Sequence, residues 1–125
     1  MKIMIAAALA AFTLQEPTLL SGPPTDQQFA WARRSLNETM LDYPSARFRD
    51  VHADRRRVCG FVNGKNQLGA YTGWKRFVVM GVANSSANIE GSEDFDGLIE
   101  MMCDDEPAVP SDRDYSDRLT YRPGR

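Results

Sequence analysis

Lys65 and Asn66 lie between Gly64 and Gly69 in a short polar stretch whose composition suits anion binding. A glycine-containing loop exposes backbone N–H groups, and a lysine beside them adds positive charge, so together they can hold a phosphate or a carboxylate. The same residue types also build turns, because an asparagine side chain accepts hydrogen bonds from nearby backbone N–H groups. Both interpretations, an anion site and a turn, fit this stretch, and we expect the turn.

A second candidate is the aromatic pair Tyr71 and Trp74, which could stack on sugar rings or on a protein partner. The two residues are three positions apart, and successive side chains of a regular strand point to opposite faces of a sheet. We therefore expect at least one of the two rings to lie in the core.

Basic residues are concentrated in the middle of the chain. Residues 44–77 include eight basic and two acidic residues, with the triplet Arg55, Arg56 and Arg57 at its densest point, whereas 84–125 include four basic and 11 acidic residues. This asymmetry predicts either a basic face for an anionic partner, with an acidic tail competing for it, or solvated faces that neutralise each other. The net charge of −2 and a pI near 5.3 argue against nucleic acid as the partner.

Residues that usually perform catalysis or bind metals are sparse. His52 is the only histidine, and the cysteines of an exported chain are expected to be oxidised, so neither a zinc site nor a Cys–His nucleophile is expected. The acids at 93–96 and 104–106 lack the alternating ligands and central glycine of a calcium loop. We expect no cofactor, no metal, and a solvent-exposed loop position for His52.

The beginning of the chain indicates export. Lys2 precedes an apolar run of 12 residues at 3–14, which is typical of a secretory signal and too short to span a bilayer. We assign 1–22 to a signal peptide and linker, 23–103 to one globular domain, and 104–125 to an acidic tail without regular structure. The expected location is periplasmic or extracellular, with no transmembrane segment after signal cleavage.

Cys59 and Cys103 are the two cysteines of the chain, and an even number in an exported protein predicts a disulfide between them. Two unpaired buried thiols are the alternative. Closing a loop of this length stabilises a domain by roughly 4 kcal/mol on the chain-entropy model, so we expect reduction to be strongly destabilising.

Hydrophobic periodicity predicts an α+β domain. Thr25 and Gln28 have the spacing of a capping box, and apolar residues follow at helical spacing until Pro44 ends the helix. A short second helix over 93–102 would bring Cys103 back to the sheet.

The ranges 46–53, 55–63 and 71–82 have the composition of strands, and 84–92 reads as a loop. The expected fold is an N-terminal helix on a small antiparallel sheet of about three strands, with a short C-terminal helix linked by one disulfide.

Two segments carry a signature. Residues 43–51 read Tyr-Pro-Ser-Ala-Arg-Phe-Arg-Asp-Val, and 58–74 read Val-Cys-Gly-Phe-Val-Asn-Gly-Lys-Asn-Gln-Leu-Gly-Ala-Tyr-Thr-Gly-Trp. The chain thereby resembles a family of small exported proteobacterial proteins that share Phe-Arg-x-Val followed by Val-Cys-Gly-x-Val-Asn-x-Lys-Asn-x-x-Gly-x-Tyr-x-Gly. The resemblance implies export and supplies no activity. An acidic or polar residue often stands in that family where this chain has Phe61.

These features predict a class of function without a reaction. The leading interpretation is a non-enzymatic binding or accessory module that holds an envelope component or another protein on a basic, aromatic hairpin face. Its candidate residues are Lys65, Asn66, Tyr71, Trp74, Arg55, Arg56 and Arg57. One alternative is a small hydrolase of an envelope polymer that uses His52 or a carboxylate near the hairpin, and another is a purely structural envelope protein.

Overall fold

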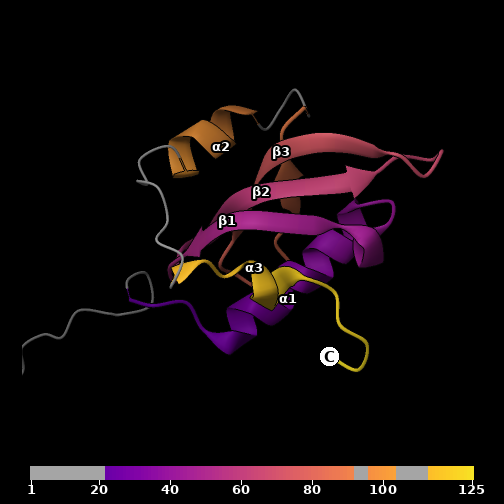
Figure 1. Ribbon diagram of the computed structural model, residues 1–125. Coiled ribbons are helices and arrows are strands. Elements are labelled where there is room, and N and C mark those ends of the chain that lie inside the picture. Colours follow the sequence, from indigo (N-terminus) through magenta and orange to yellow (C-terminus); the bar gives the residue numbers. More distant parts are fainter. Residues whose placement is uncertain (1–21, 92–95, 104–112) are drawn as a thin grey trace, which may run out of the picture.

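The computed structural model describes residues 22–91, 96–103 and 113–125. These form a four-stranded antiparallel sheet in the order β1-β2-β3-β4, with helices on both faces, which confirms the α+β prediction (Figure 1). The elements are α1 (Asp26–Thr39), a 3-10 turn (Tyr43–Ser45), β1 (Arg47–Ala53), β2 (Arg57–Lys65), β3 (Tyr71–Met80), β4 (Ala87–Ile89), α2 (Asp96–Cys103) and α3 (Ser116–Leu119). The predicted signal at 3–14 lies outside the described residues.

Helix α1 begins with the predicted capping box. The Thr25 hydroxyl accepts a hydrogen bond from the Gln28 backbone at 3.0 Å, and the Gln28 side chain accepts one from the Thr25 backbone at 3.3 Å. The helix ends at Thr39, earlier than predicted, because the segment around Pro44 forms a separate 3-10 turn. The apolar side of α1 packs on the sheet and forms one boundary of the hydrophobic core.

The larger core lies between α1 and the sheet. Phe29 and Leu36 of α1 are fully buried, as are Val62 of β2 and Phe77 of β3. Alternate residues of β2 and β3 point into this core, as expected for strands with helices packed on them. The intervening residues therefore face the opposite side of the sheet.

On that opposite side, α2 covers the end of the sheet where β2 begins (Figure 1). Ile99 of α2 packs against Val78, and the predicted disulfide joins Cys59 to Cys103 with a Cα–Cα distance of 5.9 Å. Because α2 is only eight residues long, it leaves the other end of this face, toward the β2–β3 turn, uncovered.

Strand β4 is an element that the sequence did not predict. Ala87 and Asn88 are buried and pair with Val79 and Val78 of β3, although 84–92 was expected to be a loop. Three residues are too few to show a periodicity of two, so tertiary pairing decides their structure.

The C-terminal segment corrects a second expectation. Residues 104–112 lie outside the described part, but 113–125 pack on the domain, so the prediction of an unstructured tail is wrong for that segment. Leu119 of α3 is fully buried, and the Tyr115 N–H donates to the Val51 carbonyl at 2.9 Å. One buried leucine in a polar segment gives almost no sequence signal.

A carboxylate anchors this segment to β1. Asp114 accepts hydrogen bonds from the backbone N–H groups of Asp50 and Val51 at 3.1 and 3.0 Å, and also from Ser116. Asp50 has a positive φ of 50° at an irregularity of the β1–β2 pairing. Asp114 therefore satisfies two N–H groups at this irregularity and also accepts from Ser116, the first residue of α3.

None of the helices in the described ranges has the length and apolar composition needed to cross a bilayer.

Candidate functional site

A β-bulge in the β2–β3 hairpin decides where the two candidate aromatic residues point. Asn63 of β2 pairs with Trp74 of β3, and Lys65 of β2 pairs with Tyr71 of β3. An advance of two residues along β2 is therefore matched by three residues along β3. Gly73 supplies the extra residue with a φ of +104°. The bulge brings Tyr71 and Trp74 to the same side of the sheet, so the expectation of opposite faces, which assumed a regular strand, is wrong.

Arg49 stacks between two aromatic rings on this side. Its guanidinium carbon lies 4.5 Å from the centre of the Trp74 ring and 5.2 Å from the centre of the Phe61 ring. The strand register explains the contact, because Arg49 of β1 lies directly opposite Phe61 of β2, which in turn lies opposite Arg76 of β3. The Trp74 side chain retains exposure to solvent, with the residue 37% exposed.

Tyr71 is held between two further cations. The Arg47 guanidinium lies 4.2 Å and the Lys65 ammonium 5.3 Å from the centre of its ring. The Tyr71 hydroxyl donates to the Ser45 carbonyl at 2.8 Å, which fixes the ring over the start of β1. We call the resulting surface the arginine–aromatic face, formed by Arg47, Arg49, Phe61, Lys65, Tyr71, Trp74 and Arg76.

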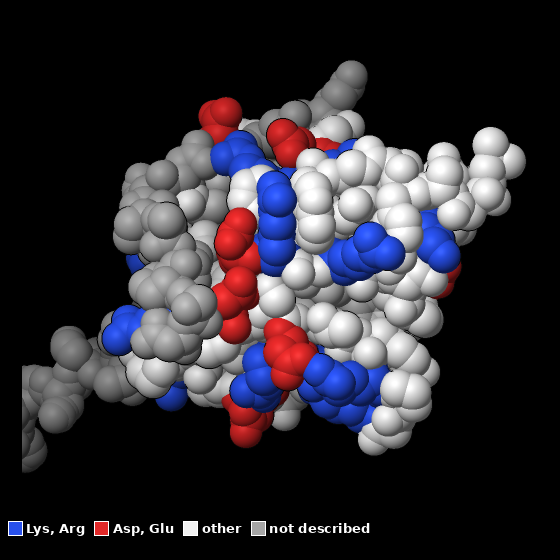
Figure 2. All heavy atoms as spheres, viewed as in Figure 1, with Lys and Arg blue, Asp and Glu red and all other residues white. Residues whose placement is uncertain are grey.

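The charge of the arginine–aromatic face is positive. It has four basic side chains. Among the described residues, Asp50 lies 3.8 Å from Arg49, and the Glu90 side chain accepts the Arg76 backbone N–H at 2.9 Å. The Arg49–Asp50 pair is about half exposed on both sides, where ion pairs contribute little. Figure 2 shows basic side chains over the strands in the view of Figure 1.

Asn66 is used for the turn. Its side-chain oxygen accepts hydrogen bonds from the backbone N–H groups of Leu68 and Ala70 at 2.9 and 3.1 Å. The Gly69 N–H donates to the Asn66 carbonyl at 3.0 Å. These bonds confirm the turn interpretation, and they leave Lys65 as the member of the pair that joins the aromatic surface.

The triplet Arg55, Arg56 and Arg57 lies at the other end of β2 and does not join the arginine–aromatic face. Arg57 is buried, only 5% exposed; its side chain pairs with Asp54 and donates to the Met102 carbonyl at 2.6 Å. Arg55 donates to the Pro23 carbonyl at 3.2 Å. These three residues are therefore not part of the predicted hairpin face, because they lie at one end of β2 and the hairpin turn lies at the other.

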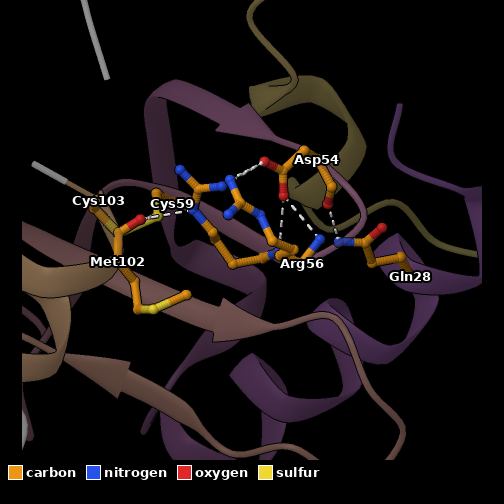
Figure 3. Close-up of polar contacts among 7 residues, drawn as sticks. Gln28, Asp54, Arg56, Cys59, Met102 and Cys103 are labelled. Carbon is orange, nitrogen blue, oxygen red and sulfur yellow. Dashed lines mark hydrogen bonds and ion pairs between the residues drawn. A yellow bond between two sulfur atoms is a disulfide. The ribbon is translucent and has the colours of Figure 1, made fainter. Parts of the chain in front are cut away.

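Asp54 organises this end of the sheet (Figure 3). Its carboxylate pairs with Arg56 at 3.1 Å and with Arg57, and its carbonyl accepts the Gln28 side chain of α1 at 2.5 Å. Burial acts to raise the pKa of Asp54, but hydrogen bonds from Arg56 and the charge and hydrogen bond of Arg57 outweigh it and hold the pKa below its ordinary value. The arginines here are structural.

His52 is a strand residue rather than a loop residue. It lies half-buried on β1 opposite Cys59, near the end of the sheet that α2 covers. The expectation of a solvent-exposed loop histidine is therefore wrong.

Sequence reasoning missed four of the seven residues of the arginine–aromatic face. Arg47 and Arg49 flank Phe48, which packs on the core, so the Arg-Phe-Arg pattern already had the alternation of a half-buried strand. Gly73 within a strand pattern is likewise a recognised sign of a bulge. The cross-strand register that joins these residues to Phe61 and Arg76 has no such local signal.

Within the described ranges, no group of three or more histidine, cysteine or acidic side chains is placed to hold a metal ion. Comparisons of the chain with protein-family models, with curated proteins and with solved structures found no match.

Proposed function

We propose that this protein is a small exported binding module that captures an anionic polysaccharide of the cell envelope on the arginine–aromatic face. The observation that supports this most directly is Arg49 stacked on both Trp74 and Phe61 at an exposed sheet surface. Export rests on the apolar run at 3–14.

Stacking prepares the arginines for an anion. A guanidinium that packs over a ring has already lost much of the rotamer freedom that binding would otherwise remove, and its N–H groups can still donate. Arg49 and Arg47 are both held in this way, on Trp74 and Tyr71. Each can then bind a carboxylate or phosphate through two parallel hydrogen bonds.

The aromatic residues favour a sugar polymer among anionic partners. Trp74 combines a ring that can pack on the apolar side of a sugar with neighbouring cations that can pair with acidic groups. The face follows adjacent strands of an open sheet, which suits an extended chain better than a compact small molecule. Its positive charge should also accelerate association with an anionic polymer.

The chain offers a matched control for this proposal. Lys75 lies between Trp74 and Arg76 in sequence, yet its side chain lies on the α1 side of the sheet beside Met40 and Ile89. Lys75→Gln and Arg49→Gln remove the same charge from opposite faces, so their comparison separates local recognition from a general effect of net charge.

Binding to alginate, a carboxylated polysaccharide, and to neutral dextran of similar size tests the proposal. We expect alginate binding that weakens with added salt, and a loss of about tenfold in affinity for Arg49→Gln and for Trp74→Ala. Lys75→Gln should retain nearly native affinity, and dextran should not bind. Equal losses for Arg49→Gln and Lys75→Gln, or equal binding of dextran, would refute recognition by this face.

A further inference from the structure

A second basic surface lies away from the arginine–aromatic face, in a groove of about 390 Å³ between α1 and the C-terminal segment. This volume is in the range of small-molecule sites. In the lower part of Figure 2, basic side chains lie beside acidic ones. The residues of the groove that matter are Arg33, Arg34, Tyr43, Tyr121, Arg122 and Arg125.

Two of the four arginines have an acidic partner. Arg34 pairs with Glu38 one turn along α1 at 3.4 Å, and Arg122 pairs with Asp117. Both pairs are exposed, where ion pairs contribute little, so these two arginines also add positive charge to the groove.

Arg33 and Arg125 donate to neutral carbonyl oxygens instead. Arg33 donates to the Arg118 carbonyl at 2.9 Å, and Arg125 donates to the carbonyls of Thr120 and Asp117. These bonds fix the two guanidinium groups at the C-terminal end of α3 without cancelling their charge. Each guanidinium has five N–H donors, so both can donate further bonds into the groove.

The two cations also affect each other. Burial and then the positive charge of Arg125 lower the pKa of Arg33; Tyr43 opposes them, Arg118 adds a smaller lowering effect, and Asp26 a still smaller raising one. Cations that crowd together in a groove are stabilised when an anion binds between them.

Two tyrosines also line the groove. The Tyr43 ring is buried, and its hydroxyl donates to the Leu119 carbonyl, so this side chain is fixed. The Tyr121 ring packs edge-on against it with a centroid distance of 6.2 Å and remains 44% exposed. An apolar group of a ligand can therefore pack on Tyr121.

We propose that this groove binds a small organic anion whose carboxylate or phosphate lies between Arg33 and Arg125 and whose ring or carbon skeleton packs on Tyr121. The site is formed by α1 and the C-terminal segment, so it is independent of the arginine–aromatic face.

Phenyl phosphate, inorganic phosphate and phenol are probes that separate the charge from the ring. NMR titration of residues 23–125, followed at the arginine side-chain N–H and the tyrosine rings, should show saturable shifts at Arg33, Arg125 and Tyr121 with phenyl phosphate. Inorganic phosphate should bind several-fold more weakly and phenol should not saturate. Arg125→Gln should reduce the affinity for phenyl phosphate about tenfold, whereas Lys75→Gln should leave it unchanged.

Three results would overturn the proposal: equal affinities for phenyl and inorganic phosphate, shifts confined to residues outside the groove, or equal losses for the two variants. If Arg125→Gln does not fold, the shift map of the native protein still decides whether the groove is the site.

Discussion

The arginines of this chain differ in what their guanidinium groups contact, and this difference separates structural from candidate binding residues. Arg57 is buried and bonded to a carboxylate and a carbonyl, whereas Arg49 lies on aromatic rings with about half of its side chain exposed. Counting basic residues along the sequence cannot make this distinction. The density of the triplet at 55–57 therefore pointed to the wrong end of β2.

Arg57→Ala should destabilise the protein by about 2–3 kcal/mol, because it leaves the Met102 carbonyl and part of Asp54 without their buried donor. Urea denaturation measures the change. Arg56→Ala is the control, since this side chain is about half exposed and its ion pair with Asp54 should be worth at most about 1 kcal/mol. Similar losses for the two variants would contradict the structural role of Arg57.

Stability should fall in acid because two carboxylates have lowered pKa values in the folded protein. Burial acts to raise the pKa of Asp114, but the hydrogen bonds from Ser116, Val51 and Asp50 lower it, as the arginines lower that of Asp54. The stabilisation is complete above the ordinary value of 3.8 and is lost as pH falls through the folded values.

The Asp114→Asn variant tests this linkage. It should be less stable than the native protein near pH 7, and this difference should shrink as pH falls through the lowered folded pKa of Asp114. The urea concentration at the midpoint of unfolding, measured for both proteins from pH 7 into acid, tests this expectation. A difference between the two proteins that does not change with pH would show that the charge of Asp114 is unimportant.

At the scale of elements, the bulge in β3 is what creates the candidate site. A regular strand would separate Tyr71 from Trp74, and the added residue at Gly73 places both on the uncovered face. Helix α2 sets the other limit of that face, because the disulfide holds it over the beginning of β2. Bulge and helix together determine which side chains are available to a partner.

Gly73→Ala should weaken alginate binding and destabilise the fold by about 1 kcal/mol or more, because its φ of +104° is unfavourable for a residue with a Cβ. Gly69→Ala is the matched control, since Gly69 also has a positive φ, of +82°, but lies in the turn. It should cost similar stability and leave binding unchanged. Unaltered binding by a folded Gly73→Ala variant would argue against the bulge as the organiser of the face.

At the scale of the whole molecule, the strongest local patterns predicted the fold and weak ones did not. The capping box at Thr25, the strand composition of 55–63 and the even cysteine count each gave a correct prediction. Strand β4 and α3 escaped because each depends on only one or two buried residues supplied by tertiary packing. Part of the candidate face depended on cross-strand register, which is set by the assembled sheet.

The C-terminal segment belongs to the folded domain, and Leu119 is the residue that shows it. Leu119→Ala should destabilise the protein by about 2–5 kcal/mol, because it opens a cavity at a fully buried position. Leu68→Ala, at a turn residue that is 91% exposed, should have no measurable effect in the same thermal denaturation experiment. Equal stability of the two variants would mean that the segment does not pack as described.

The most direct test of the central claim uses the two tryptophans, Trp74 on the arginine–aromatic face and Trp31 on α1. With only two tryptophans, the chain has two indole N–H groups, whose signals can be followed by nitrogen-15 NMR during titration with an alginate oligosaccharide. The account predicts a saturable shift of the Trp74 signal that Arg49→Gln reduces, with the Trp31 signal unchanged. Saturable binding that shifts Trp31 and leaves Trp74 unchanged would contradict it.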